Sequence, residues 1–379
     1  MTTSSRRATV TGALPWALPF FVSLLLVPLF VWSVSQGGAT PLIVPLAAWL
    51  GSWLADLVAG HNRANADPAT PTAAMALHRA LTIIWWPLQT GMLLWALIYI
   101  TYGPDIGLGT KLASFAALGI IAGTIGIVYA HELMHQPCKL ERWCADLLLA
   151  SVLYSHFRSE HLLVHHVHVG TPKDPVTAPY GEGFWRFYMR VLPASLRSAW
   201  AAEAARLNKS GRQTLDARNP FWRYWTLQVA YLLVVLVIAG WPGLFFFAIQ
   251  ASVAVWQLEL INYIEHYGLT RKLQDDGTYE RQGAHHSWDG SQRATNWLLI
   301  NLQRHSDHHI HPNRRYPVLQ HLGRDQAPQL PFGYAAMGIL ALMPHLWRKR
   351  MNPRVKAWRA KYYPEIADWR PYNRRAFRS

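Results

Sequence analysis

The sequence predicts an all-α integral membrane protein: a bundle of six transmembrane helices with a histidine-rich helical cap on the cytoplasmic side. Three observations support this prediction. The 379 residues are 51% hydrophobic and include 19 Trp, 16 Tyr and 13 Phe, aromatic residues that settle at bilayer interfaces. Six apolar runs are long enough to cross a bilayer. Four short histidine clusters each adjoin a strongly apolar stretch.

The six apolar runs are each near or above the roughly 17 to 20 residues that cross a hydrocarbon core. The first run follows Arg6 and Arg7, as in a signal peptide, but its apolar core is too long and no small-residue cleavage site follows it. We therefore expect it to be retained as a helix. The expected transmembrane helices cover residues 14–34, 40–58, 80–102, 112–129, 222–239 and 241–261.

Basic residues in the short loops predict the orientation of the bundle. Arg6 and Arg7 precede the first run and Arg63 and Arg79 lie between the second and the third, whereas residues 35–39 carry no Lys or Arg. Because short cytoplasmic loops carry an excess of basic residues, we expect both termini on the cytoplasmic side of the inner membrane. All four histidine clusters then fall on that same side.

The histidine clusters predict a polynuclear metal site. Spacings of three and four residues place the members of a cluster on roughly one helical face. His166 is turned about 100° from His165, which lets neighbouring rings reach different metals. One buried histidine is usually structural, but that explanation cannot cover every cluster. Imidazole suits iron, zinc, copper and nickel, so the clusters do not identify the metal. The candidate ligands are His131, His135, His161, His165, His166, His266, His305, His308 and His309.

Two other classes of protein are alternatives at this point. Residues 131–135 (HELMH) match the zinc-protease pattern H-E-x-x-H, with Glu132 as the general base of an intramembrane zinc metalloprotease. That enzyme needs one further ligand, which would leave the other clustered histidines without a role. A non-enzymatic metal carrier or transporter is also weaker, because transport sites normally lie near the membrane midplane. We expect His285 and His286 to be loop residues.

The formal net charge of +15 is concentrated at the C-terminus. Residues 348–379 carry 11 Lys or Arg against Glu365 and Asp368, enough to attract anionic lipid headgroups or an acidic protein. Since no recognition motif accompanies this charge, nucleic acid is not an expected partner. We divide the chain into one membrane-embedded domain, residues 1–345, and a basic cytoplasmic tail, residues 346–379.

Two longer strings resemble a known family. Residues 262–269 (NYIEHYGL) and 302–309 (LQRHSDHH) are similar to the membrane-bound alkane 1-monooxygenase, or alkane omega-hydroxylase, family. Residues 131–135 and 160–166 resemble that family's first two histidine boxes. The wider superfamily, which includes membrane fatty-acid desaturases and xylene monooxygenase, shares the spacings of the boxes but matches those two strings less closely.

The resemblance implies an O2-dependent hydroxylase that converts the terminal methyl group of an alkane or alkyl chain to a primary alcohol. It implies two iron ions held by the nine clustered histidines, and electrons from rubredoxin and its NAD(P)H-dependent reductase. The chemistry agrees, because an unactivated C–H bond has no acidic proton or leaving group, and its oxidation needs a redox metal in a dry, shaped cavity. A xylene-type methyl hydroxylase and a membrane fatty-acid desaturase are the alternatives.

Acidic neighbours of the ligands and basic residues near the last cluster complete the expected site. We expect the carboxylates to orient the imidazoles and to offset part of the metal charge. These are Glu132, Glu160, Glu265 and Asp307.

Cys138 and Cys144 are the only cysteines, too few for an internal iron–sulfur or rubredoxin centre, so electrons must come from another protein. Arg314 and Arg315 are the candidate docking residues for an acidic donor.

Overall fold

The computed structural model describes residues 10–373, and apart from isolated β-bridges its regular elements are all helical. The α-helices are α1 (Val10–Ala17), α2 (Leu26–Gln36), α3 (Ile43–Pro45), α4 (Ser52–Ala59), α5 (Ala76–Tyr102), α6 (Leu108–Ile121), α7 (Val128–Met134), α8 (Lys139–Ala150), α9 (Phe157–Glu160), α10 (His166–His168), α11 (Phe184–Lys209), α12 (Phe221–His266), α13 (Arg293–Leu298), α14 (His305–Ile310), α15 (Tyr334–Ala341) and α16 (Pro344–Tyr362).

Short 3-10 or π-helical segments join or extend many of these helices. They are η1 (Leu18–Leu25), η2 (Thr40–Leu42), η3 (Leu46–Gly51), η4 (Thr72–Met75), η5 (Ala122–Ile127), η6 (His161–His165), η7 (Ala284–His286), η8 (Tyr316–Val318) and η9 (Pro371–Asn373). Two of the π-helical segments matter for the site. Segment η5 links α6 to the helix that carries the first histidine cluster, and η6 contains part of the second cluster. Extra residues inserted into a helical turn are frequent at functional sites.

Among residues 10–373, five helical segments are long and apolar enough to cross a membrane. They are Leu14–Gln36, Thr40–Ala59, Thr72–Tyr102, Leu108–Met134 and Phe221–His266. The first four contain the first four expected helices. The expected fifth and sixth helices both lie within the last segment, so the structure gives five candidate spans where the sequence predicted six.

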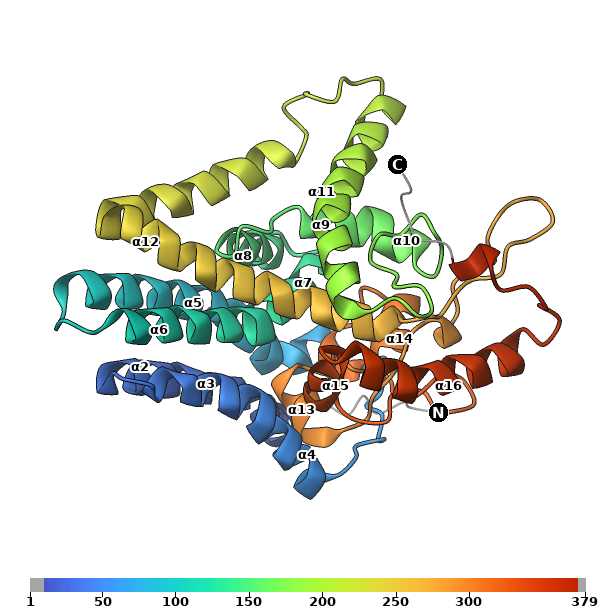
Figure 1. Ribbon diagram of the computed structural model, residues 1–379, viewed down its shortest axis with the longest axis horizontal. Coiled ribbons are helices and arrows are strands. Elements are labelled where there is room, and N and C mark those ends of the chain that lie inside the picture. The colour runs from blue at the N-terminus through green and yellow to red at the C-terminus, as the bar shows by residue number, and fades with distance from the viewer. Residues whose placement is uncertain (1–9, 374–379) are drawn as a thin grey trace, which may run out of the picture.

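Helix α12 explains this difference. Its 46 residues would extend about 69 Å at about 1.5 Å per residue, more than twice the roughly 30 Å of a hydrocarbon core. Gly240 interrupts it with φ 61° and ψ −158°, a conformation open almost only to glycine, and Pro242 follows. The chain doubles back at this point, so α12 consists of two helical arms (Figure 1).

Glycines bring the second arm of α12 against the helix that leads to the first histidine cluster. A side chain at Gly119 would place its Cβ 2.6 Å from the carbonyl oxygen of Gln250, and one at Gly123 would meet the carbonyl oxygen of Ala254 at 3.0 Å. Small residues at a spacing of four allow such close approach of backbones in membranes. The approach positions the end of α12, which carries His266, beside the end of α7, which carries His131.

The C-terminal segment expected as a basic tail begins with a packed helix. Trp347, Met351, Val355 and Trp358 of α16 are buried, and their spacing of three to four residues places them on one helical face that joins the hydrophobic core. Residues 374–379, the end of that expected tail, lie outside the described residues. Helix α16 lies at the same end of the molecule as the histidine-bearing elements (Figure 1).

Candidate metal centre

All nine candidate ligands meet at one end of the bundle. Helix α7 and the residue after it supply His131 and His135, and the end of α12 supplies His266. Segment η6 and helix α10 supply the second cluster, and α14 supplies the last. Eight of the nine are buried and His166 is half-buried.

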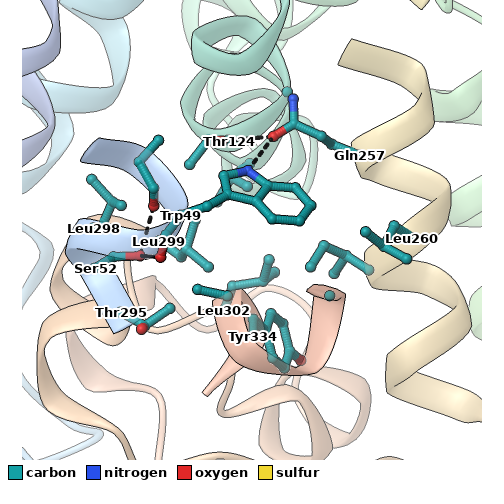
Figure 2. Close-up of a pocket in the computed structure, with 16 residues that line it drawn as sticks. Trp49, Ser52, Thr124, Gln257, Leu260, Thr295, Leu298, Leu299, Leu302 and Tyr334 are labelled. Atoms are coloured by element: carbon teal, nitrogen blue, oxygen red, sulfur yellow. Dashed lines mark hydrogen bonds between the residues drawn. The ribbon is translucent and has the colours of Figure 1, made fainter. Parts of the chain in front are cut away.

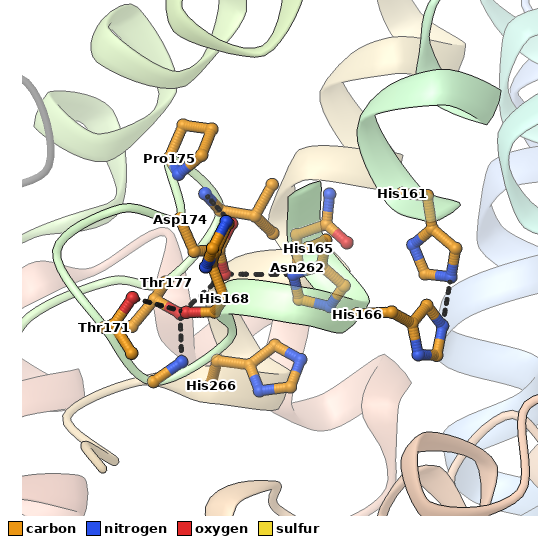
Figure 3. A network of polar contacts seen from close by, with 12 residues as sticks. His161, His165, His166, His168, Thr171, Asp174, Pro175, Thr177, Asn262 and His266 are labelled. Atoms are coloured by element: carbon orange, nitrogen blue, oxygen red, sulfur yellow. Dashed lines mark hydrogen bonds and ion pairs between the residues drawn. The ribbon is translucent and has the colours of Figure 1, made fainter. Parts of the chain in front are cut away.

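Four of these histidines form a first quartet, His131, His135, His161 and His308, whose ring nitrogens all lie within 4.8 Å of one another. The Nε2 atom of His161 is 3.0 Å from that of His131 and 3.0 Å from that of His135. His166 adjoins this quartet, with its Nε2 atom 2.9 Å from that of His161 (Figure 3). The first quartet therefore has a fifth imidazole at its edge.

A second quartet consists of His165, His266, His305 and His309, again with ring nitrogens within 4.8 Å of one another. The Nε2 atoms of His305 and His309 are 2.9 Å apart, and those of His266 and His305 are 3.0 Å apart. The two quartets adjoin, because residues that are neighbours in the sequence lie in or beside different quartets. His165 belongs to the second quartet and His166 lies beside the first. Likewise His308 belongs to the first quartet and His309 to the second. The second and the last histidine clusters of the sequence are thus each divided between the two quartets, whereas His131 and His135 stay together in the first.

The charge state of the rings suits metal binding. Burial lowers the pKa of His135, His161, His166, His305, His308 and His309 well below the usual range, and neighbouring histidines add to this effect. These six rings are therefore neutral, the form that ligates a metal. The Nε2 atom of His161 faces three other ring nitrogens but can share a proton with only one of them. A cation bound by the lone pairs satisfies them all, so the donor set fits a metal in each quartet.

Groups around the quartets hold the opposite ring nitrogens of several ligands. His165 donates from Nδ1 to the Oδ2 atom of Asp174 at 3.0 Å, and Thr177 donates to the same oxygen at 2.7 Å (Figure 3). His266 donates from Nδ1 to the carbonyl oxygen of His286 at 3.2 Å. Such contacts fix the tautomer in which Nε2 carries the lone pair for the metal. Sequence reasoning missed Asp174, whose one local signal is its position in a polar loop nine residues after His165.

The four carboxylates expected to orient the ligands lie in different surroundings. Glu265 accepts a hydrogen bond from Tyr334, and its Oε1 atom is 3.3 Å from Nδ1 of His305. Glu132 accepts from Gln136 at 3.1 Å.

The other two carboxylates differ in how far their oxygens are engaged. One carboxylate oxygen of Glu160 is buried without a hydrogen-bond partner. Asp307 pairs with Arg314 at 2.5 Å and accepts from the Gln320 backbone N–H at 2.9 Å. Of the four expected carboxylates, Glu265 has a contact with a ligand imidazole.

The two arginines expected to dock a donor are both engaged in ion pairs. Arg314 pairs with Asp307, and Arg315 pairs with the buried Glu141 at 2.8 Å, a carboxylate that Arg79 also contacts. Their side chains are 17% and 10% exposed, respectively, so each presents a limited surface to a partner. Both line a cleft open to solvent that reaches His135 and also includes Arg142.

An apolar cavity reaches the quartets from within the bundle. This first apolar cavity is lined by His131, His161 and His305 together with Phe157 and Ile261. It shares several lining residues, among them Gly123, Val128 and Leu302, with a second apolar cavity. Trp49, Leu260 and Tyr334 surround this second cavity, and Gln257 accepts hydrogen bonds from Trp49 and Thr124 at its edge (Figure 2). The metal centre thus lies between an apolar interior and a polar cleft.

Comparisons with known proteins agree with this site. A model of the fatty acid desaturase family matches residues 110–341, a range that contains all nine histidines. Alkane 1-monooxygenase 2 of Pseudomonas aeruginosa is 37% identical over 358 residues, 92% of this chain and 94% of the relative. Alkane 1-monooxygenase 1 of that organism is 40% identical over 310 residues, 81% of each chain. The hydroxylase component of xylene/toluene monooxygenase from Pseudomonas putida is 27% identical over 248 residues, 65% of each chain.

Removing one member of a quartet should remove metal. We expect His308→Ala to lower the bound metal by about one ion per chain and to abolish oxidation activity, because the first quartet loses a ligand. His165→Ala should do the same through the second quartet. His345→Ala, at an exposed position of α16, is the control and should retain metal. Elemental analysis of the purified proteins measures the difference, and full metal content in His308→Ala would contradict the assignment.

Proposed function

The chain belongs to the alkane 1-monooxygenases, within the fatty acid desaturase family, and we propose that it is a di-iron enzyme that hydroxylates the terminal methyl group of alkanes or alkyl chains. The observation that carries this proposal is the meeting of two quartets of buried imidazoles with an apolar cavity. An alkane offers no polar handle, so its recognition depends on such a cavity. When bound, the two iron ions would supply the oxidation of an unactivated C–H bond by O2.

The residues of the chain position the ligands and keep water out. Asp174 and the His286 carbonyl hold the imidazoles of His165 and His266, so that their Nε2 lone pairs converge. The apolar cavity beside the quartets is lined by Ile127, Phe157, Leu258 and Ile261. These apolar side chains favour a hydrocarbon over water. The other seven clustered histidines lie close to His131 and His135 in and beside the two quartets, which supports the monooxygenase over the zinc-protease alternative.

We further propose that both arms of α12 cross the membrane, which makes six crossings, with both termini and the metal centre on the cytoplasmic side of the inner membrane. The reversal at Gly240 and the length of α12 support the two crossings. The distribution of basic residues supports the orientation. In this arrangement the substrate enters from the lipid through the apolar cavity, and electrons arrive from the aqueous side.

Product analysis distinguishes the proposed reaction from its two alternatives. Cells that express the protein should convert n-alkanes to primary alcohols when supplied with n-alkanes, alkylbenzenes and saturated fatty acids together. Gas chromatography with mass spectrometry identifies the products, and the His308→Ala variant is the inactive control. Benzylic alcohols as the main product would instead support a xylene-type hydroxylase, and unsaturated fatty acids would support a desaturase.

Trp49 is the bulky residue that we expect to limit the length of the substrate. It lines the second apolar cavity and stacks on Trp256 with ring centroids 5.6 Å apart. Replacing it by Ala opens space at that end of the cavity, so Trp49→Ala should oxidise alkanes a few carbons longer than the wild type does. Trp32→Ala, at an exposed position of the first span, is the matched control. An unchanged product range in Trp49→Ala would contradict this path for the substrate.

We propose that rubredoxin, reduced by its NAD(P)H-dependent reductase, docks on the cleft lined by Arg142, Arg314 and Arg315. Since Arg314 and Arg315 already pair with carboxylates, reversing their charge would also break ion pairs. Arg142→Glu removes a positive charge from the same cleft, and no ion pair of Arg142 is present among residues 10–373.

Arg142→Glu should raise the KM for reduced rubredoxin severalfold and weaken its dependence on salt, with kcat at saturating donor unchanged. The physical reason is that electrostatic steering, which is screened beyond about 10 Å at 0.1 M salt, depends on charges at the docking surface. Arg218→Glu, at an exposed position between α11 and α12, is the control. Steady-state kinetics at several salt concentrations measure both constants, and the same KM in both variants would refute docking at this cleft.

A further inference from the structure

Residues 10–373 contain one more convergence of ligand-type side chains outside the two quartets. Glu280, His285 and His286 bring a carboxylate oxygen and two ring nitrogens within 4.8 Å of one another. Tyr363, at the end of α16, places its hydroxyl among them, 3.0 Å from Nε2 of His285 and 2.8 Å from Nε2 of His286. This group thus joins the loop after α12 to the C-terminal helix.

The hydrogen bonds of the group determine where its protons lie. Burial would raise the pKa of Glu280, but hydrogen bonds from His286, the Lys272 backbone and Tyr363 outweigh it and lower the pKa to about 2. Glu280 is therefore an acceptor, and the Tyr363 hydroxyl donates to it in a short hydrogen bond. The Gly283 backbone N–H donates to Nδ1 of His286 at 2.8 Å. Because its Nδ1 accepts, neutral His286 carries its proton on Nε2 and donates to Tyr363.

This proton arrangement favours a hydrogen-bonded network over a third metal site. A histidine ligand needs a lone pair on the nitrogen that faces the metal, and Nε2 of His286 carries a proton instead. The Tyr363 hydroxyl and the Glu280 carboxylate are likewise already engaged with each other. The polar atoms of this group already have hydrogen-bond partners, so we look for its function in the segment that it holds in position.

The group holds a ligand of the second quartet. The carbonyl oxygen of His286 accepts the hydrogen bond from Nδ1 of His266, whose Nε2 atom faces His305. The side chain of His286 has no solvent exposure and is anchored at both ring nitrogens, so its backbone has little freedom to move. The position of this carbonyl therefore depends on Tyr363 and Glu280.

Helix α16 clamps the same loop through two further contacts. Trp358 donates from its indole nitrogen to the carbonyl oxygen of His285 at 2.7 Å. The ring of Tyr362 stacks on that of His285, with centroids 4.5 Å apart and an angle of 11° between the planes. The C-terminal helix, distant in sequence from every candidate ligand, is thus connected to His266 through one loop.

We propose that Glu280, His286 and Tyr363 form a latch, a set of positioning residues through which helix α16 fixes His266 in the orientation and tautomer that the second quartet requires. This inference rests on the metal centre of the proposed function, and it concerns metal retention rather than the reaction. Removing a group that hydrogen-bonds to a metal-ligating histidine typically lowers the metal affinity about 10- to 100-fold.

The experiment measures how firmly the iron-loaded protein retains its metal. Purified wild type, Tyr363→Phe and Glu280→Gln are exposed to increasing concentrations of an iron(II) chelator, and the iron that remains bound is counted. Tyr363→Phe removes one hydroxyl and keeps the ring that packs beside Trp358. Tyr362→Phe is the matched control, because it removes a hydroxyl from the adjacent residue, whose partner is the carbonyl oxygen of Asp325. Size-exclusion chromatography in detergent verifies that each variant is folded.

We expect Tyr363→Phe and Glu280→Gln each to lose one of two irons at a chelator concentration about 10-fold lower than the wild type does, the lower end of that range, because both residues act on His266 through the His286 carbonyl. The other iron, and both irons of Tyr362→Phe, should be retained as in the wild type. Wild-type retention of both irons in folded Tyr363→Phe and Glu280→Gln would overturn the latch. A third iron in the wild type, lost in these variants while the other two stay, would overturn it in favour of a metal site. Wild type that retains two irons but yields no alcohol from alkanes would refute the proposed function alone.

Discussion

Much of this structure depends on keeping nine imidazoles crowded and dry at one end of a helical bundle. Ring nitrogens about 3 Å apart, such as those of His131 and His161, cannot all be satisfied by sharing protons. Protonating the rings to imidazolium would not help, because burial makes the charged form costly. The remaining solution is a cation held by the lone pairs. The surrounding helices must therefore hold these ring nitrogens close together so that a metal ion can bind them.

The helical packing meets this demand by close backbone contact. Gly119 and Gly123 let the second arm of α12 approach the helix that continues into α7, and this approach brings His266 and His131 to the same end of the bundle. In a bilayer, where lipid is as apolar as a leucine side chain, such close contact is a main source of helix association. The apolar cavity and the metal centre share His131, His161 and His305 as part of their walls, so the ligands face an apolar space.

Polar residues orient the rings from outside. Asp174, Glu265 and the carbonyl of His286 each contact the ring nitrogen of a ligand that faces away from its quartet. Two of these groups are held by residues far along the chain, since Tyr334 donates to Glu265 and Tyr363 anchors His286. The segment after the last histidine cluster consequently belongs to the machinery of the site.

The sequence by itself determined the all-helical class, the apolar spans and the identity of the nine clustered histidines, because hydropathy and helical spacing are properties of one segment at a time. The tertiary structure decided which ring joins which quartet, as the separation of His165 from His166 shows. It also decided the roles of Asp174 and Tyr363 and the ion pair of Arg315 with Glu141. These outcomes depend on how segments distant in sequence pack, and the spacing within one helix carries no information about the element that it will face.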